Sequence, residues 1–133
     1  MAAKIFTLEE ANRLIPQLRA ILTGIMEKRD KIAARQKEVY AIRRIIDGNG
    51  HNPEALGFAA KERELKELIN QLNEDIEKIN SLGCELKDIH LGLVDFRSIR
   101  EGREVYLCWK FDEDEISFWH DLHTGFAGRQ PLF

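Results

Sequence analysis

The side chains able to do chemistry are concentrated near the C-terminal end of this chain. The stretch from Leu93 to Phe133 holds both tryptophans, two of the four histidines, one of the two cysteines and a run of acids. Imidazoles, carboxylates and thiols bind metal ions and act as acids, bases or nucleophiles. We therefore expect a functional site, if the protein has one, in this stretch.

The segment W-H-D-L-H offers three metal ligands, namely His120, Asp121 and His123. Nitrogen and oxygen donors suit a divalent ion such as zinc. Two histidines three residues apart point to opposite faces of a regular strand, so the strand must end or bulge between them to bind one ion. If both histidines bind the ion, Asp95, Asp121 or Cys108 is available as the third ligand. Without an ion, His120 is expected to be buried and hydrogen-bonded to a carboxylate or a carbonyl.

Two further groups have alternative interpretations. Cys108 would be a nucleophile only if a neighbour such as His123 or Lys110 lowered its pKa, and cysteines on strands are more often buried apolar residues. In the segment G-F-A-G-R, the glycine backbone and the guanidinium form a candidate anion site. Alternatively the tail folds back and its arginine pairs with a local acid. The anion-site residues are Gly125, Gly128 and Arg129.

The elements that carry these groups are predicted from a change in periodicity. After Gly83 the apolar pattern changes from a helical period to a period of two. This pattern predicts strands near 93–97, 104–111 and 116–122, joined by a turn at Ser98–Arg103 and by the acidic segment FDEDE. The expected arrangement is a three-stranded antiparallel meander followed by a glycine-rich tail.

The shortest registers align Asp95 with Tyr106 and Tyr106 with Asp121, although a slip of one residue would exchange the faces. Asp95 and Asp121 would then lie about 10 Å apart, with room for a water, a metal-bound water or a small polar ligand. Asp95, Tyr106 and Asp121 are therefore the candidate catalytic residues, unless this face is simply half-exposed or covered. The apolar face is expected to hold Val94, Phe96, Val105, Leu107, Trp109, Phe118, His120 and Leu122. The mixed face is expected to hold Leu93, Asp95, Tyr106, Cys108, Lys110, Trp119, Asp121 and His123.

Two long helices are predicted before the strands. T-L-E-E places a capping box at Thr7 and Glu10, and Pro16 either kinks the helix or restarts it. Residues 47–57 end the first helix, with His51 and Asn52 in a turn, and a second helix follows over about 58–82. We expect a long, coiled-coil-like antiparallel helical hairpin. The apolar stripes consist of Leu18, Ile25, Ile32, Val39 and Ile46 in one arm and Leu65, Ile69, Leu72, Ile76 and Ile79 in the other.

Composition excludes several classes of protein. The chain has 20 basic and 23 acidic residues, a net charge of −3, and no apolar run of membrane-spanning length. Basic residues of the first arm, between 28 and 44, are matched by acids of the second arm, so nucleic-acid binding is not expected. The two cysteines and the N-terminus favour a single cytoplasmic domain over 1–133, with the hairpin at 7–82 and the sheet and tail at 83–133.

Five motifs occur together in this order: FTLEEAN, LGLVDF, GREVYLCW, FWHD and GFAGRQP. This set resembles an uncharacterised prokaryotic family, domain-of-unknown-function family 2203, over nearly the whole chain. The resemblance implies a helical hairpin with a small C-terminal sheet, and it implies no activity, cofactor or partner. Arg97 replaces the usual proline of the family, and FDEDE replaces its usual Gly-Glu turn. The motifs highlight Asp95, Trp109, His120, Asp121, Gly125, Gly128 and Arg129.

These observations predict an α+β protein that forms a homo-oligomer, because the thin seam between Ile25 and Val39 leaves apolar residues to be covered by another copy. The first functional hypothesis is a non-enzymatic interaction module, with a self-associating or partner-binding hairpin and a polar and aromatic recognition surface on the C-terminal sheet. The second is a small metal- or ligand-binding enzyme that performs metal-assisted hydrolysis with Asp95, His120, Asp121 and His123.

Overall fold

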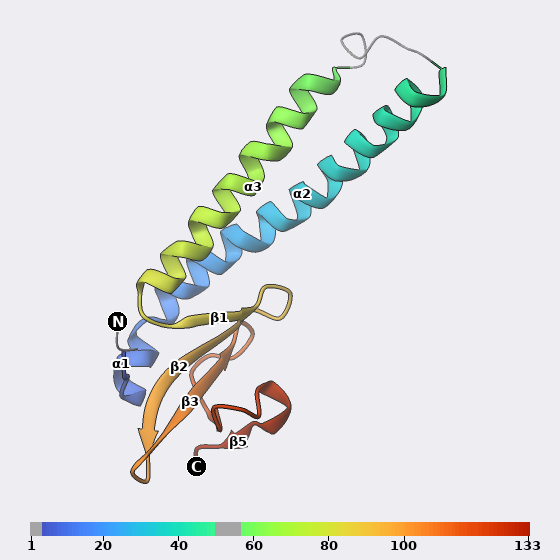
Figure 1. Ribbon diagram of the computed structural model, residues 1–133. Helices are drawn as coiled ribbons and strands as arrows, with labels where there is room; N and C mark the ends of the chain where they lie inside the picture. The colour runs from blue at the N-terminus through green and yellow to red at the C-terminus, as the bar shows by residue number, and fades with distance from the viewer. Residues whose placement is uncertain (1–3, 50–56) are drawn as a thin grey trace. The chain divides into compact units, whose positions relative to one another are not determined.

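The computed structural model describes residues 4–49 and 57–133, which form an α+β fold (Figure 1). The α+β class is confirmed, whereas the expected strand number is wrong, because the described part contains a five-stranded antiparallel sheet. The helices are α1 (Leu8–Arg13), α2 (Ile15–Asn49) and α3 (Phe58–Ser81). The strands are β1 (Glu85–Asp88), β2 (Leu93–Arg100), β3 (Arg103–Lys110), β4 (Phe118–His120) and β5 (Gln130–Pro131), with a short 3-10 helix, η2, at Phe126–Gly128.

The chain divides into two compact units. One unit, the sheet unit, comprises the N-terminal residues up to Thr23 together with Ile76–Phe133. The other, the helical unit, comprises Gly24–Asp75. Within the described residues, none of the helices combines the length and apolar character needed to span a membrane.

The start of the sheet unit follows the predicted capping chemistry. The Thr7 hydroxyl accepts a hydrogen bond from the Glu10 backbone N–H (3.1 Å), and the Glu10 carboxylate accepts one from the Thr7 backbone N–H (2.9 Å). Leu14 then caps the end of α1, and α2 begins at Ile15. Pro16 occupies the first turn of α2, where its missing N–H costs no helical hydrogen bond. Of the two predicted effects of this proline, restarting a helix is the one observed.

Ion pairs join α2 and α3 within the helical unit. Partners that lie later in α2 lie earlier in α3, as in an antiparallel pair, and Figure 1 shows the two helices side by side. Residues 50–56, which include His51 and Asn52, lie outside the described residues, so the helical hairpin stays a prediction. The interhelical pairs are Lys28–Asp75, Arg35–Glu64, Lys61–Glu38 and Arg43–Glu62.

The first hairpin of the sheet is tighter than predicted. Arg100 pairs with Arg103, and the turn between them consists of Glu101 and Gly102, both with positive φ (52° and 79°). A two-residue loop with this backbone matches the right-handed twist of the flanking strands. The predicted turn at Ser98–Arg103 and the predicted alignment of Asp95 with Tyr106 are therefore wrong. Asp95 lies opposite Cys108 instead.

The second register differs from the prediction by one residue. Tyr106 pairs with His120 rather than with Asp121, so β4 presents its side chains on the faces opposite to those expected. Trp119 joins the apolar face opposite Leu107, and His120 joins the mixed face. The connection from 111 to 117 is fixed by distant residues, because the Asn12 amide oxygen accepts the Ile116 N–H (2.9 Å). The prediction assumed the shortest possible turn between the strands, and that assumption does not account for a contact with a distant residue.

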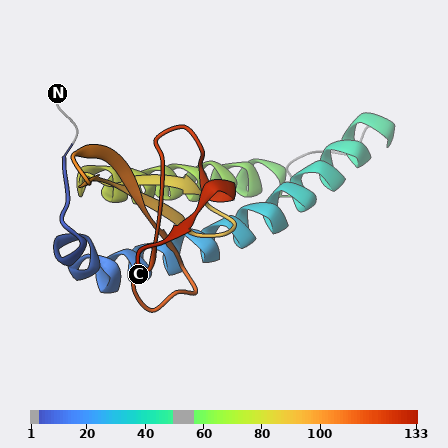
Figure 2. The ribbon, with the colours of Figure 1, turned by 90° about the horizontal axis from the view of Figure 1, so that it is seen from below.

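The apolar face of the sheet forms the core of the sheet unit. Val94, Phe96 and Trp109 are fully buried, and Phe6 packs edge-to-face on Phe96 with ring centroids 5.3 Å apart. The Phe6 backbone N–H donates to the Arg97 carbonyl (2.7 Å), which holds the N-terminal segment against β2. Figure 2 shows this unit from below, where the twist of the sheet turns the strands relative to one another. The core therefore holds the strands that carry the polar residues of the other face.

Candidate functional site

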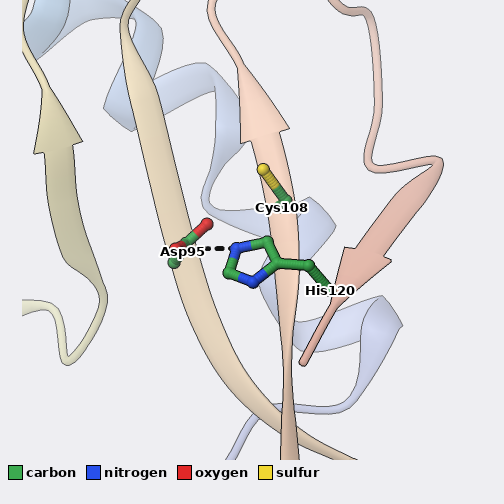
Figure 3. Close-up of side chains that lie close together, drawn as sticks. All are labelled: Asp95, Cys108 and His120. Atoms are coloured by element: carbon green, nitrogen blue, oxygen red, sulfur yellow. Dashed lines mark hydrogen bonds and ion pairs between the residues drawn. The ribbon is translucent and has the colours of Figure 1, made fainter. Parts of the chain in front are cut away.

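Three buried polar side chains meet on the mixed face of the sheet (Figure 3). Asp95 comes from β2, Cys108 from β3 and His120 from β4, and one ligand atom of each lies within 4.8 Å of the others. Their exposed fractions are 4%, 1% and 2%. Three neighbouring strands therefore contribute a carboxylate, a thiol and an imidazole to one closed cluster, which we call the Asp–Cys–His cluster.

Both ring nitrogens of His120 have acceptor partners. Its Nδ1 lies 2.7 Å from the backbone carbonyl oxygen of Asp121, and its Nε2 lies 3.0 Å from Asp95 Oδ2. A carbonyl oxygen can only accept, so Nδ1 carries the hydrogen of that bond. One further proton is shared between Nε2 and Asp95. The expectation that His120 is buried and hydrogen-bonded to a carboxylate or a carbonyl is confirmed, because it bonds to both.

Burial controls the acidity of the other two members. It raises the pKa of Asp95, against the opposing effect of the His120 ring. It also raises the pKa of the Cys108 thiol to about 12, with the nearby Asp95 carboxyl acting in the same direction. The thiol is therefore protonated near neutral pH, unlike the thiolate that a nucleophilic cysteine requires. The geometry gives no support to a catalytic role for Cys108 as a nucleophile.

Tyr106 lies beside the cluster. Its ring centroid is 5.4 Å from that of His120, and the cations of Lys87 and Arg97 lie over its ring at 4.7 and 5.5 Å. Burial and a hydrogen bond with Glu85 raise the pKa of Tyr106. The phenol is therefore a neutral side wall of the cluster near physiological pH.

The other predicted ligands lie elsewhere. Asp121 is only half-buried and pairs with Arg103 at 2.8 Å, and His123 is exposed. Asp121 reaches the cluster through its backbone carbonyl alone. Among residues 4–49 and 57–133, Asp95, Cys108 and His120 lie together as possible metal ligands, whereas His120, Asp121 and His123 do not.

The candidate anion-site residues lie at the turn that contains the 3-10 helix η2. Gly125 has a positive φ of 63°, and a side chain on Gly128 would meet Thr124 at 2.5 Å. Arg129 donates from Nη2 to the Glu113 carboxylate (2.6 Å) and to the Cys108 carbonyl (3.1 Å). Its guanidinium is thus engaged by a local acid, as the alternative interpretation predicted.

Glu113 is an organising residue that the sequence interpretation missed. Its carboxylate accepts from the backbone N–H of Lys110 (2.7 Å) as well as from Arg129, and its backbone carbonyl accepts from the Trp109 indole and from Arg19. Four donors, two from the end of β3, one from α2 and one from the C-terminal tail, therefore converge on one turn residue. Nothing in the string FDEDE distinguishes this acid from the three other acids beside it.

Comparison with known proteins gives the family. A family model described as an uncharacterized conserved protein, DUF2203, matches residues 4–132, so the chain belongs to this family. The resemblance inferred from the five motifs is thereby confirmed. No curated protein and no solved structure matches the chain.

Proposed function

We propose that this protein is a non-enzymatic interaction module that self-associates through its helical unit. The observation that carries the proposal is the poor burial of apolar side chains there. Among the described residues of this unit, Ile25 and Ile32 are the buried apolar side chains, and Tyr40 and Ile45 are 66% and 39% exposed. The remaining large apolar residues are only half-buried: Met26, Val39, Ile42, Ile46, Phe58, Leu65, Leu68, Ile69 and Leu72.

Ion pairs do not compensate for this exposure. Most interhelical pairs involve half-exposed side chains, and such pairs contribute about 0–1 kcal/mol each. Most helical stability in proteins comes from packing an apolar face rather than from helix propensity. A partner that covers the half-buried apolar residues would therefore add the burial that α2 and α3 do not give each other.

A second copy of this chain is the partner that the charges favour. The helical unit contains ten basic and ten acidic residues, so two copies do not repel. A groove along α2 and α3 carries Lys31 and Arg35 on one side and Glu64 and Glu67 on the other, with Ala34 and Leu68 between them. Under a twofold axis that runs along the groove, the Lys31 side of one copy would face the Glu67 side of the other.

The Asp–Cys–His cluster supports the non-enzymatic part of the proposal. Metal-assisted hydrolysis requires an ion with an open coordination position that substrate and water can reach. The three side chains of the cluster are 1–4% exposed, and His123 does not join them. The mixed face is also closed as a recognition surface, because Tyr106 and Cys108 are buried.

The experiment is sedimentation equilibrium over a wide concentration range, with two matched variants. Ala34 lines the groove, whereas Ala33 is exposed on the same helix and does not line it. We expect the wild type and Ala33→Glu to self-associate with similar constants. Ala34→Glu should weaken association at least about tenfold, which corresponds to about 1.4 kcal/mol.

Circular dichroism should show equal helix content for both variants. A wild-type protein that stays monomeric at every concentration would overturn the proposal. Equal association by Ala34→Glu and Ala33→Glu would show that this groove is not the interface.

A further inference from the structure

We infer that Asp95, Cys108 and His120 bind one divalent transition-metal ion, with zinc as the best match. The three donors are an oxygen, a sulfur and a nitrogen, and they converge from adjacent strands of one sheet (Figure 3). This combination of carboxylate, thiolate and imidazole is typical of zinc, whereas calcium and magnesium prefer oxygen ligands throughout. The site is independent of the self-association proposed for the helical unit.

The orientation of His120 suits a ligand. The Nδ1–H group donates to the Asp121 carbonyl oxygen, with 2.7 Å between nitrogen and oxygen, which fixes the ring and leaves Nε2 facing Asp95 and Cys108. Metal-binding histidines generally have their second nitrogen fixed by a carbonyl or carboxylate in this way. In the neutral ring with Nδ1–H, the lone pair of Nε2 points into the cluster.

The distances require only small movements. In a tetrahedral zinc site with bonds of about 2.0–2.3 Å, neighbouring ligand atoms lie about 3.3–3.6 Å apart. The Nε2–Oδ2 distance is 3.0 Å, and the widest separation in the cluster is at most 4.8 Å. Zinc would therefore open the Asp95–His120 contact slightly and draw the Cys108 sulfur inward by little more than about 1 Å. We expect rotation of the side chains to achieve this without moving the strands.

The charges of the ligands also match a divalent ion. On binding, the Cys108 thiol proton and the proton shared by His120 and Asp95 would leave to solvent. The carboxylate and the thiolate then carry two negative charges, which a divalent cation neutralises. A neutral assembly is the form of these groups that a closed interior tolerates best, because an isolated buried charge is strongly unfavourable. The ion then holds β2, β3 and β4 together at a place closed to substrate, because the three side chains are 1–4% exposed.

The first measurement is elemental mass spectrometry of the untagged full chain, purified without chelator. A parallel titration of metal-free protein with cobalt(II) reports the sulfur ligand directly, because bound thiolate gives a sulfur-to-cobalt charge-transfer absorption. The wild type should hold close to one zinc per chain, should show this absorption with cobalt and should gain thermal stability with added zinc.

The matched pair is Cys108→Ser and Cys84→Ser. Both cysteines are free and buried in the sheet unit, and Cys84 lies outside the cluster. Cys84→Ser should keep the metal and the charge-transfer absorption, whereas Cys108→Ser should lose the absorption. His120→Gln should lose zinc while Asp121→Asn, which alters a side chain outside the cluster, should keep it.

Two results would overturn the inference. One is a wild-type protein that carries no metal and shows neither absorption nor stabilisation when metal is added. The other is a charge-transfer absorption that survives in Cys108→Ser. Either result would leave the cluster as a hydrogen-bonded carboxyl–imidazole pair within the core. Because cobalt is added to folded wild-type protein, the decision does not depend on whether every variant folds.

Discussion

Replacing Glu113 by alanine tests the structural account of the sheet unit most directly. Its side chain and that of Arg129 are 19% and 12% exposed and lie 2.6 Å apart. The substitution removes the carboxylate that pairs with this guanidinium and the acceptor of the Lys110 N–H. The Nε atom of Arg129 is already buried without a hydrogen-bond partner. The variant therefore leaves a nearly buried cation with little compensation.

The size of the effect follows from these contacts. Removing one partner of a buried ion pair costs about 3–5 kcal/mol. Arg129 keeps the Cys108 carbonyl at 3.1 Å and the Phe118 ring at 4.1 Å, which lowers this cost. The lost acceptor for Lys110 adds about 1 kcal/mol. We expect Glu113→Ala to destabilise the sheet unit by about 3 kcal/mol, and Glu113→Gln, which keeps an acceptor oxygen, by about 1–2 kcal/mol.

Urea unfolding followed by tryptophan fluorescence measures this effect, because Trp109 and Trp119 are both buried in the sheet unit. Glu115→Ala is the control, since Glu115 is an exposed acid of the same turn and its loss should change stability by less than about 0.5 kcal/mol. If Glu113→Ala costs no more than Glu115→Ala, the convergence of donors on Glu113 does not organise this turn. Equal losses of stability for Glu113→Ala and Glu113→Gln would refute the expectation that keeping an acceptor oxygen at this position reduces the loss.

Three other predictions concern single residues. Burial raises the pKa of the Cys84 thiol from 9.0 to about 11. The stability that this protonated thiol contributes below pH 9 should therefore fall by up to about 3 kcal/mol as the pH rises through 11. Urea titrations at each pH measure this alkaline loss, which should be smaller in Cys84→Ala. Gly128→Ala should destabilise the fold by about 1–3 kcal/mol in thermal unfolding, because its Cβ would lie 2.5 Å from Thr124. Adding Thr124→Gly to the same chain should recover part of this stability. A Gly128→Ala variant as stable as the wild type would contradict the contact. Thr7→Ala removes the capping box and should lower stability by about 1 kcal/mol in urea, whereas an unchanged midpoint would show that α1 contributes nothing to cooperative folding.

The helical elements could be predicted from sequence because their signals are local. The capping box, the proline in the first turn of α2 and the start of α3 at Phe58 depend on residues within one or two helical turns. The first β-hairpin was mispredicted for a related reason. Its two-residue turn has Glu101 at positive φ, where Asn, Asp or Gly is usual, so Glu-Gly was not recognised as the turn.

The remaining strands have little local signal. β5 contains only Gln130 and Pro131, and β1 contains four residues with a register irregularity between Leu86 and Asp88. Such segments become strands because a neighbouring strand offers hydrogen-bonding partners, not because of their own apolar pattern. The five-stranded sheet therefore depends on contacts that a periodicity argument does not contain.

The Asp–Cys–His cluster shows that the register of one strand pair decides which side chains meet. Asp95 and Cys108 share a face in the predicted and in the observed alignment, because the first hairpin shifts by two residues. His120 changes face, because the second shifts by one, and that single step brings its imidazole to within 3.0 Å of Asp95. The residue types were visible in the sequence, but their meeting depends on the connection fixed by Asn12 and Glu113.

A buried group of this kind is expensive for a small sheet, since apolar residues of similar volume would often be more stabilising. All three polar members lie below 5% exposure, and two of them have a pKa raised by burial. The hydrogen bonds of His120 to Asp95 and to the Asp121 carbonyl offset part of this desolvation cost. A bound divalent cation offsets it directly, which is why metal content distinguishes an ion-binding site from a hydrogen-bonded core pair.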